Sequence, residues 1–246
     1  MNYHWNWLIF WADAPDGTGT YLHTLIRGAY WTLGVSVLAW IIALALGVIV
    51  GVLRTTRIGW VERVCAAYVE LFRNVPLLVQ MFLWYFVFPE IVPQALGDAI
   101  KQADPVWSTF WTATVCLGLF TSSRIAEQVR AGITALPLGQ NMAGTALGLT
   151  RPQVYRYILL PMTARIIMPP LTSEALNLIK NSSIAFTIGL LEITGAARSM
   201  QEFSFQIFES FTAATILYLI INLVVVVLMR LIEKWISVPG FIGTKR

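Results

Sequence analysis

Two long runs of this sequence contain no charged residue, and they limit what the chain can fold into. Residues 35–53 and 211–229 each extend for nineteen residues without Asp, Glu, Lys or Arg. A helix rises 1.5 Å per residue, so about 20 apolar residues cross the hydrocarbon core of a bilayer. In the whole chain 57% of residues are hydrophobic and 12% are charged, against roughly 25% charged in soluble domains. The sequence therefore predicts a membrane protein.

Three further stretches are expected to cross the membrane, although prolines and charges interrupt them. They are residues 66–89, 106–130 and 165–191. With the two charge-free runs they predict an all-α fold with about five transmembrane helices. The amino-terminal sequence MNYHWNWLIFW has no basic region ahead of an apolar stretch, so we do not expect a cleaved signal peptide. Its tryptophans are typical of a segment that lies in the membrane interface.

Basic residues gather in the connections on one side of these spans. The other side holds only Arg27, Lys101 and Arg198. By the positive-inside rule the side with more basic residues is cytoplasmic. We therefore expect the amino terminus outside and the carboxyl terminus inside. The net charge of +4 then reflects this topology rather than nucleic-acid binding. The expected organisation is an interfacial segment at 1–27, one transmembrane domain at 28–236 with a cytoplasmic loop at about 131–164, and a cytoplasmic tail at 237–246. The basic residues assigned to the cytoplasm are Arg54, Arg57, Arg63, Arg130, Arg151, Arg156, Arg165, Arg230, Lys234, Lys245 and Arg246.

Motifs of enzymes and of metal sites are missing from the sequence. It has no G-x-x-x-x-G-K-[ST] phosphate loop, no H-E-x-x-H and no G-x-S-x-G, and its only histidines are His4 and His23. Cys65 and Cys116 have no C-x-x-C spacing. We therefore expect neither catalysis, nor a cofactor, nor a metal or disulfide in this chain.

The stretch from residue 139 to 161, GQNMAGTALGLTRPQVYRYILLP, contains no run long enough to cross a membrane. Its apolar residues recur at helical spacing, and Thr150 followed by Pro152 is typical of a helix start, so we expect two short helices. Gly139, Ala143 and Ala146 form a small-residue face that lets another backbone approach closely. Two interpretations fit equally: a docking helix, or an amphipathic loop lying under the bilayer.

Several of these motifs resemble a known family. The pattern GQNMAGTALGL, with nine residues between Gly148 and ILLP, is similar to the cytoplasmic EAA loop of binding-protein-dependent ABC transporter permeases. VELFRNVPLLVQMFLWYF, AEQVRAGITALPLGQ and PPLTSEALNLIKNSSIA resemble the polar amino-acid uptake branch, and most of all the permease subunits of bacterial glutamate/aspartate importers. The sequence departs from the pattern where Met142 replaces the usual glutamate and Gly144 the second alanine.

The resemblance implies a type I ABC importer permease in a bacterial inner membrane. In such permeases the loop docks on a cytoplasmic ATPase, which uses the ATP, so the chain itself is no enzyme. The implied partners are a second, homologous permease, two ATPase subunits and an extracytoplasmic amino-acid-binding protein. The residues expected to couple the chain to the ATPase are Gly139, Gln140, Met142, Ala143, Gly144, Ala146, Gly148 and Leu149.

Ionisable residues inside the spans are the main candidates for the transport path, because each costs several kcal/mol in a bilayer and usually faces a cavity or a partner. Glu70 and Arg73 are expected to form an ordinary ion pair three residues apart on one helix. For Arg124 and Glu127 two interpretations remain. They neutralise each other as a gating pair, or Arg124, within TSSRIAEQ, binds a substrate carboxylate through two parallel hydrogen bonds.

The stretch 165–191 contributes the other path candidates. Pro169 and Pro170 predict a bend or a local opening of the helix, Glu174 falls near mid-membrane, and KNSSIAFT faces the outer half of the path. Gln80 is a weaker candidate, because a membrane glutamine more often bonds a neighbouring helix. The complete set of expected path residues is Arg124, Glu127, Glu174, Lys180, Asn181, Ser182, Ser183 and Gln80.

The function that the resemblance implies is ATP-dependent import of glutamate and aspartate through a path shared with a second permease. Glutamine, a basic amino acid or another polar solute is the alternative substrate. Two other classes remain open from the residues alone. One is a passive channel or ion-coupled carrier, and the other is a scaffold subunit whose intramembrane charges only hold helices together.

Overall fold

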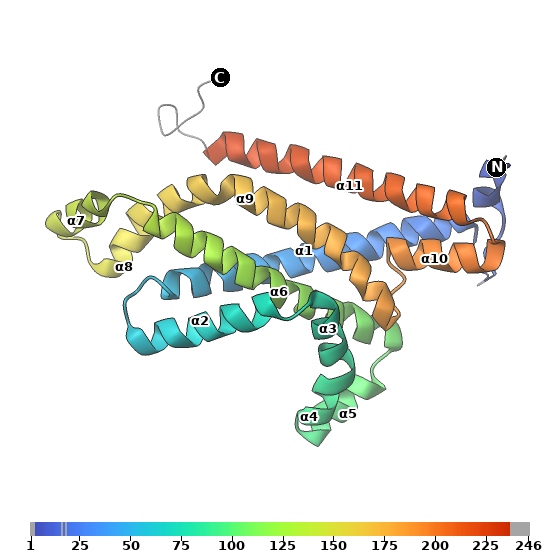
Figure 1. Ribbon diagram of the computed structural model, residues 1–246, viewed down its shortest axis with the longest axis horizontal. Coiled ribbons are helices and arrows are strands. Elements are labelled where there is room, and N and C mark those ends of the chain that lie inside the picture. Colours follow the sequence, from blue (N-terminus) through green and yellow to red (C-terminus); the bar gives the residue numbers. More distant parts are fainter. Residues whose placement is uncertain (1–2, 16, 18, 237–246) are drawn as a thin grey trace.

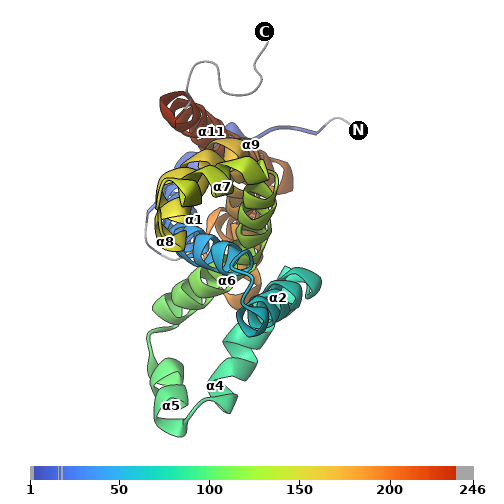
Figure 2. The same ribbon diagram turned by 90° about the vertical axis from the view of Figure 1, so that its left-hand side faces the viewer.

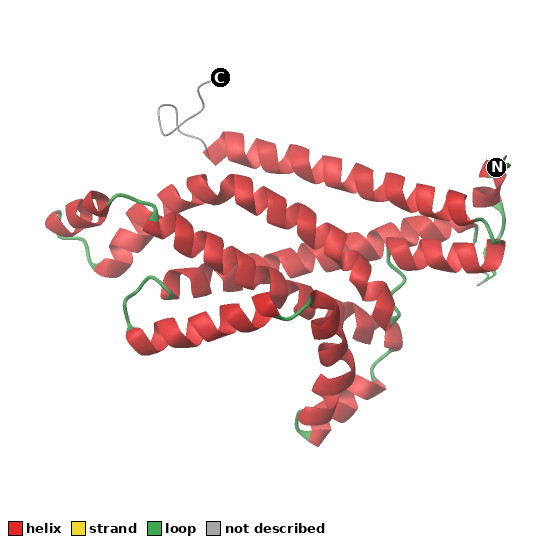
Figure 3. Cartoon of the chain, viewed as in Figure 1, coloured by secondary structure: helices red, strands yellow, loops and turns green. Residues whose placement is uncertain are grey.

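The computed structural model describes residues 3–15, 17 and 19–236. Within this part the regular structure is helical, as Figure 3 shows, and the strand-like contact is an isolated bridge between Asp13 and Thr20. This confirms the expected all-α fold. The predicted tail at 237–246, with Lys245 and Arg246, lies outside the described residues.

Four long helices form the body of the protein (Figure 1): α1 (Tyr21–Leu53), α6 (Pro105–Thr134), α9 (Leu160–Asn181) and α11 (Ile207–Ile236). Among the described residues, α1 and α11 are by themselves long and apolar enough to cross a membrane. The five expected spans coincide with these four helices and with a bent pair described below. The amino-terminal segment, with a short 3-10 helix η1 (Trp7–Trp11), and the carboxyl end of α11 lie at opposite ends of the bundle.

Small residues hold α1 against α6. Ala39, Ala43, Gly47 and Gly51 recur every four residues on α1, and all are buried. A Cβ atom at Gly47 would lie 2.7 Å from Ile125 Cβ, and one at Gly51 would lie 2.7 Å from the Ala126 carbonyl oxygen. The two helices are therefore parallel and in backbone contact, as small-xxx-small patterns allow in membranes.

The second expected span is broken. α2 (Gly59–Asn74) is followed, at a bend of 103°, by α3 (Leu77–Phe82), the π-helical turn η2 (Leu83–Val87) and α4 (Phe88–Ile91). Pro76 has no N–H, so it cannot bond the carbonyl of Phe72 one turn earlier. After the bend, α4 and α5 (Gln94–Gln102) stand away from the bundle, as the end view in Figure 2 shows.

The connection between α6 and α9 contains the two short helices that the sequence predicts. α7 is Leu138–Ala146, and α8 (Arg151–Val154) continues through the π-helical turn η3 (Tyr155–Leu159) into α9. The start near Thr150 is confirmed, because Gln153 Oε1 accepts a hydrogen bond from Thr150 N at 2.8 Å in a capping box. Gly148, with φ of 81°, allows the turn between α7 and α8.

Of the two alternatives predicted at the proline pair of α9, the local opening is wrong, whereas the bend stays a prediction. The backbone stays α-helical from Leu160 to Asn181, through Pro169 and Pro170. Each proline removes one hydrogen bond of the helix, but the turns on both sides remain intact. The chain then continues through the 3-10 helix η4 (Ser182–Ile188) and a left-handed Gly189 into α10 (Ile193–Ser204), which packs on α1 and α11.

Candidate functional site

Glu127, on α6, lies between arginines from three helices. It forms ion pairs with Arg54, which caps the carboxyl end of α1, and with Arg130 on the next turn of α6, and it lies 3.8 Å from Arg73 on α2. Two expectations are therefore wrong. Arg73 does not pair with Glu70, and Glu127 does not pair with Arg124, because arginines from α1 and α2 reach Glu127.

Arg124 faces α9 instead. Its Nε lies 3.9 Å from Glu174 Oε2, which is an ion pair too long for a hydrogen bond. Its guanidinium carbon lies 5.3 Å from the centre of the Phe120 ring. The side chain of Arg124 is 41% exposed, whereas that of Glu174 is 12% exposed. Arg124 is thus placed by loose contacts and keeps donors for another group.

Gln128 completes this contact between α6 and α9. Its Nε2 donates to Glu174 Oε1 at 3.2 Å. Its Oε1 is buried and has no hydrogen-bond partner in the described chain. Gln128 is not among the residues predicted from the sequence, although its position one helical turn after Arg124 is a signal that could have identified it.

These side chains form one group, which we call the arginine–glutamate cluster. It carries four arginines against two glutamates, and Glu62 on α2 lies close enough to Arg130 to add a third negative charge, so the formal surplus is one positive charge. Such a surplus favours an anionic ligand, because like charges near one another need a counter-charge. The cluster consists of Arg54, Arg73, Arg124, Glu127, Gln128, Arg130 and Glu174.

The hydroxyl residues before Arg124 lie inside the protein rather than around its guanidinium. Thr121, Ser122 and Ser123 are all buried. Ser122 Oγ hydrogen-bonds the Tyr68 hydroxyl at 2.6 Å, and Ser123 Oγ donates to the Phe120 carbonyl at 2.7 Å. The Ser122 hydroxyl therefore links α6 to α2, whereas the Ser123 hydrogen bond stays within α6.

The polar residues after α9 lie apart from the cluster. Lys180 is exposed and forms no ion pair in the described chain. Ser182 Oγ donates to the Ile179 carbonyl at 2.8 Å, and Ser183 Oγ donates to the Lys180 carbonyl at 2.7 Å. Asn181 is half-buried. No described hydrogen bond or ion pair joins these residues to Arg124 or Glu174.

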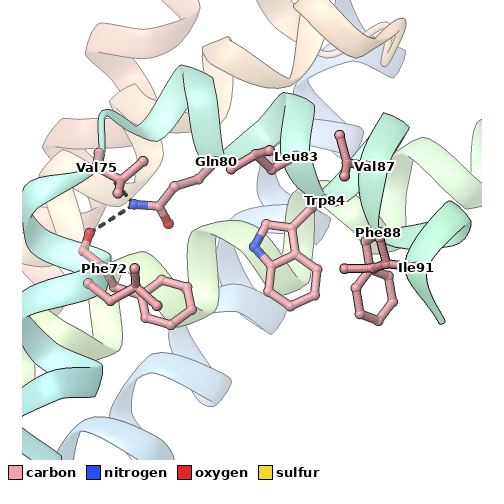
Figure 4. Close-up of a pocket in the computed structure, with 9 residues that line it drawn as sticks. Phe72, Val75, Gln80, Leu83, Trp84, Val87, Phe88 and Ile91 are labelled. Carbon is pink, nitrogen blue, oxygen red and sulfur yellow. Dashed lines mark hydrogen bonds between the residues drawn. The ribbon is translucent and has the colours of Figure 1, made fainter.

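Gln80 is engaged in the bend between α2 and α3. Figure 4 shows its Nε2 pointing at the carbonyls of Phe72 and Val75, to which it donates at 2.9 and 2.8 Å. The bend borders an apolar groove of about 310 Å³. The groove is lined by Leu71, Phe72, Val75, Gln80, Leu83, Trp84, Val87, Phe88 and Ile91. Gln80 thus lies in a different place from the cluster.

The residues expected to couple to an ATPase divide into an outer and an inner set. Gly139, Met142, Ala143 and Ala146 are exposed on α7, together with Leu138 and Leu147. Gly144 is buried, and a Cβ there would lie 2.7 Å from Ile158 Cδ1. Gln140 and Leu149 are half-buried, and Gly148 forms the turn. The outer set leaves α7 with an uncovered apolar face.

Glu192 is a buried acid whose structural role is not among the predictions from the sequence. Glu192 is fully buried at the start of α10, where its Oε1 accepts from Gly195 N at 2.9 Å. Its Oε2 accepts from the Tyr218 hydroxyl at 2.6 Å, and Thr32 lies 3.5 Å away. Glu192 therefore joins α10 to α11 and α1. Glutamate is an unusual residue at a helix N-cap, so this role is hard to predict from the sequence.

Comparisons with known proteins agree with this architecture. The family described as binding-protein-dependent transport system inner membrane component matches residues 9–238. The glutamate/aspartate import permease protein GltJ of Escherichia coli strain K12 is 47% identical over 246 residues, which is the full length of both chains. The glutamine transport system permease protein GlnP of the same strain is 32% identical over 230 residues, covering 93% of this chain and 96% of GlnP.

Solved structures show the same fold. A chain of an amino acid ABC transporter crystallised with histidines superposes with a TM-score of 0.73 at 28% identity, over 87% of this chain and 94% of that one. A chain of the methionine ABC transporter MetNI in an inward-facing conformation has a TM-score of 0.71 at 19% identity, over 88% and 98%. This chain therefore belongs to the inner membrane components of binding-protein-dependent transport systems, as a multi-pass permease subunit rather than an enzyme.

Proposed function

We propose that this permease subunit imports glutamate and aspartate, and that Arg124 binds a carboxylate of the substrate. The observation that carries the proposal is the half-exposed Arg124 guanidinium, which lies in a cluster with surplus positive charge. Among the described residues its ion-pair partner is Glu174, at 3.9 Å. A guanidinium binds a carboxylate with two parallel hydrogen bonds. The full-length identity of 47% to a glutamate/aspartate permease supports the same substrate class.

The energy for import comes, in this proposal, from a cytoplasmic ATPase that docks on α7. Exposed Leu138, Met142 and Leu147 offer an apolar surface at one end of the molecule (Figure 1), and the small side chains of Gly139 and Ala143 let a partner approach closely. This favours a docking helix over a loop under the bilayer. The end of the bundle that carries α7 is then cytoplasmic, and the amino terminus is outside.

A second permease closes the transport path in this proposal. The arginine–glutamate cluster is partly exposed in one chain. Figure 2 shows α4 and α5 standing away from the four long helices, and many apolar side chains on α2 to α5 are exposed. An extracytoplasmic binding protein delivers the amino acid at the opposite end from α7. Lys180, Asn181, Ser182, Ser183 and Gln80 stay predicted path residues.

Glutamine is the second candidate substrate, because GlnP shares 32% identity over most of the chain. The two substrates differ in one group, since glutamine has a neutral amide where glutamate has a carboxylate. A neutral amide leaves the surplus positive charge of the cluster without a counter-charge. The cluster therefore favours the acidic substrates.

Uptake into proteoliposomes that contain the whole complex tests the proposal. Radiolabelled glutamate, aspartate, glutamine and arginine are supplied with the binding protein, with and without ATP. We expect ATP-dependent uptake of the acidic pair, and at least about a tenfold loss of it in Arg124→Ala, which corresponds to one lost charge-assisted hydrogen bond. Arg198→Ala is the control, because Arg198 forms an exposed ion pair with Glu202 on α10, away from the arginine–glutamate cluster.

Two results would overturn the assignment. Unchanged uptake of glutamate by an assembled Arg124→Ala complex would remove Arg124 from the path. Preference of the wild type for glutamine or arginine would refute the acidic substrate. If Arg124→Ala instead fails to assemble, the scaffold interpretation of the intramembrane charges gains support.

A further inference from the structure

Arg124 and Glu174 place a positive and a negative group side by side, which complements the carboxylate and the ammonium group of an amino acid. One side offers a guanidinium, and the other offers a carboxylate 3.9 Å away. An amino acid carries a carboxylate and an ammonium group close together, so it satisfies both partners at once when it enters between them. The ion pair is open enough for this, because no hydrogen bond joins Arg124 to Glu174 directly.

The ammonium group is the part of the substrate for which Arg124 cannot account. It has three N–H donors and no acceptor, so it needs carbonyl or carboxylate oxygens. Leaving it unpaired in a closed site costs the full desolvation of a charge. Within the arginine–glutamate cluster, Glu127 is already held by Arg54 and Arg130. Glu174 is the carboxylate that remains for the substrate.

Gln128 adds a second acceptor at the same place. Its Nε2 donates to Glu174 Oε1, and because the Gln128 Oε1 is bonded to the same amide carbon, it also lies near this carboxylate. This Oε1 is buried and has no partner in the part of the chain that the structure describes. A buried amide oxygen without a donor is costly, and an ammonium group held by Glu174 would supply the missing donor.

We propose that Glu174 and Gln128 form the subsite for the α-ammonium group of the substrate, beside Arg124, which takes a carboxylate. Gln128 both orients Glu174 and offers its own Oε1 to the ammonium group. The inference rests on the proposed function, because it takes an acidic amino acid as the substrate. It also explains why Glu174 lies in a cluster that favours anions: its described contacts are a long ion pair with Arg124 and a hydrogen bond from neutral Gln128, so it can still bind the ammonium group.

The experiment compares glutamate with glutarate, which has both carboxylates but lacks the amino group. The assembled complex in lipid nanodiscs, without the binding protein, is titrated with each radiolabelled compound to millimolar concentrations. We expect the wild type to bind glutamate at least about tenfold more tightly than glutarate, the value of one charge-assisted hydrogen bond. In Glu174→Gln and Gln128→Leu this preference should fall toward one, with glutarate binding unchanged or improved.

The control variants separate a subsite from a structural effect. Glu174→Asp keeps the carboxylate and should retain most of the preference. Glu202→Gln makes the same change at a distant carboxylate that also pairs with an arginine, and should leave binding unchanged. Arg124→Ala should weaken both compounds alike, since both carry carboxylates.

The outcomes distinguish the two proposals. If the wild type binds neither compound, or binds glutamine more tightly than glutamate, the substrate assignment fails and the subsite with it. If the wild type prefers glutamate over glutarate and assembled Glu174→Gln and Gln128→Leu keep that preference, the substrate assignment stands and the ammonium subsite is refuted.

Discussion

Gln80 donates a hydrogen bond to the Phe72 carbonyl at 2.9 Å, across the bend between α2 and α3. Phe72 lies four residues before Pro76, whose missing N–H leaves that carbonyl without its helical partner. The same amide nitrogen donates to the Val75 carbonyl at 2.8 Å. One side chain thus satisfies the carboxyl end of α2 and fixes the 103° turn of the chain.

Replacing Gln80 should therefore loosen the bend. In Gln80→Leu the two carbonyls lose their donor, and we expect the complex to lose about 1–3 kcal/mol of stability, seen as a lower midpoint in thermal unfolding. Gln94→Leu is the control, because Gln94 is exposed on α5. Equal midpoints for both variants would show that the bend does not depend on this side chain.

The sequence predicted the positions of the helices better than their shapes. The charge-free runs located α1 and α11, because a membrane span needs a fixed length of apolar chain. The bend after Asn74 was not predicted, although Pro76 was visible. Its angle depends on a contact between residues eight positions apart. The opposite error occurred at Pro169, where neighbouring turns keep α9 continuous.

The backbone contact between α1 and α6 (the α1–α6 seam) should not tolerate a larger side chain at its glycines. In Gly51→Val the new side chain would meet the Ala126 carbonyl and the Val129 side chain, each 2.7 Å from the Cβ position. Overpacking of this kind costs about 1–3 kcal/mol, so we expect less assembled complex and a lower unfolding midpoint. Ala45→Val adds the same kind of bulk to an exposed position on α1. A similar loss in that control would refute the seam as the cause.

Glu127 should matter more for stability than a surface acid of the same type. Glu127→Gln removes the charge that partners Arg54 and Arg130. We expect a loss of about 2 kcal/mol, because charge-assisted hydrogen bonds to partly buried groups are lost. The exposed pair Arg198–Glu202 is the comparison, and Glu202→Gln should cost less than about 1 kcal/mol. Chemical unfolding of the two variants measures both losses in the free energy of unfolding. Equal losses would contradict a special role of Glu127.

The candidate site shows what spacing rules miss. Residues three apart on a helix face each other, so the sequence suggested the pairs Glu70–Arg73 and Arg124–Glu127. In the structure Glu127 pairs with Arg54, seventy-three positions away in the sequence. Arg124 pairs with Glu174 on α9. Which arginine reaches a carboxylate depends on helix packing, which the periodicity of one helix does not contain. The residue types were identified correctly, whereas their pairing was not.

Met142 provides a direct test of the proposed docking of an ATPase on α7. Its side chain is exposed among other apolar residues, so Met142→Asp should place a charge in the contact with the ATPase. We expect less ATPase to copurify with the permease and weaker stimulation of ATP hydrolysis by the loaded binding protein. Asn141→Asp adds the same charge at the neighbouring exposed position. Full copurification of Met142→Asp would favour a loop that lies under the bilayer.

Tyr3 ties the amino-terminal segment to α11 in a way that predicts its titration. Its hydroxyl donates to Glu209 Oε2 at 2.5 Å and lies 2.9 Å from Gln206 Oε1. The hydrogen bond to Glu209 is the main cause that raises the pKa of Tyr3 to about 12, followed by burial and by repulsion from the carboxylate. The unfolded phenol titrates near about 10, so the protonated form is favoured in the folded protein. The contact should be complete below pH 10 and lost as the pH rises through about 12.

The difference between phenolate absorbance titrations of wild type and Tyr3→Phe isolates this group. A midpoint near 10 would mean that Tyr3 does not bond Glu209, whereas a midpoint near 12 would place the segment on α11.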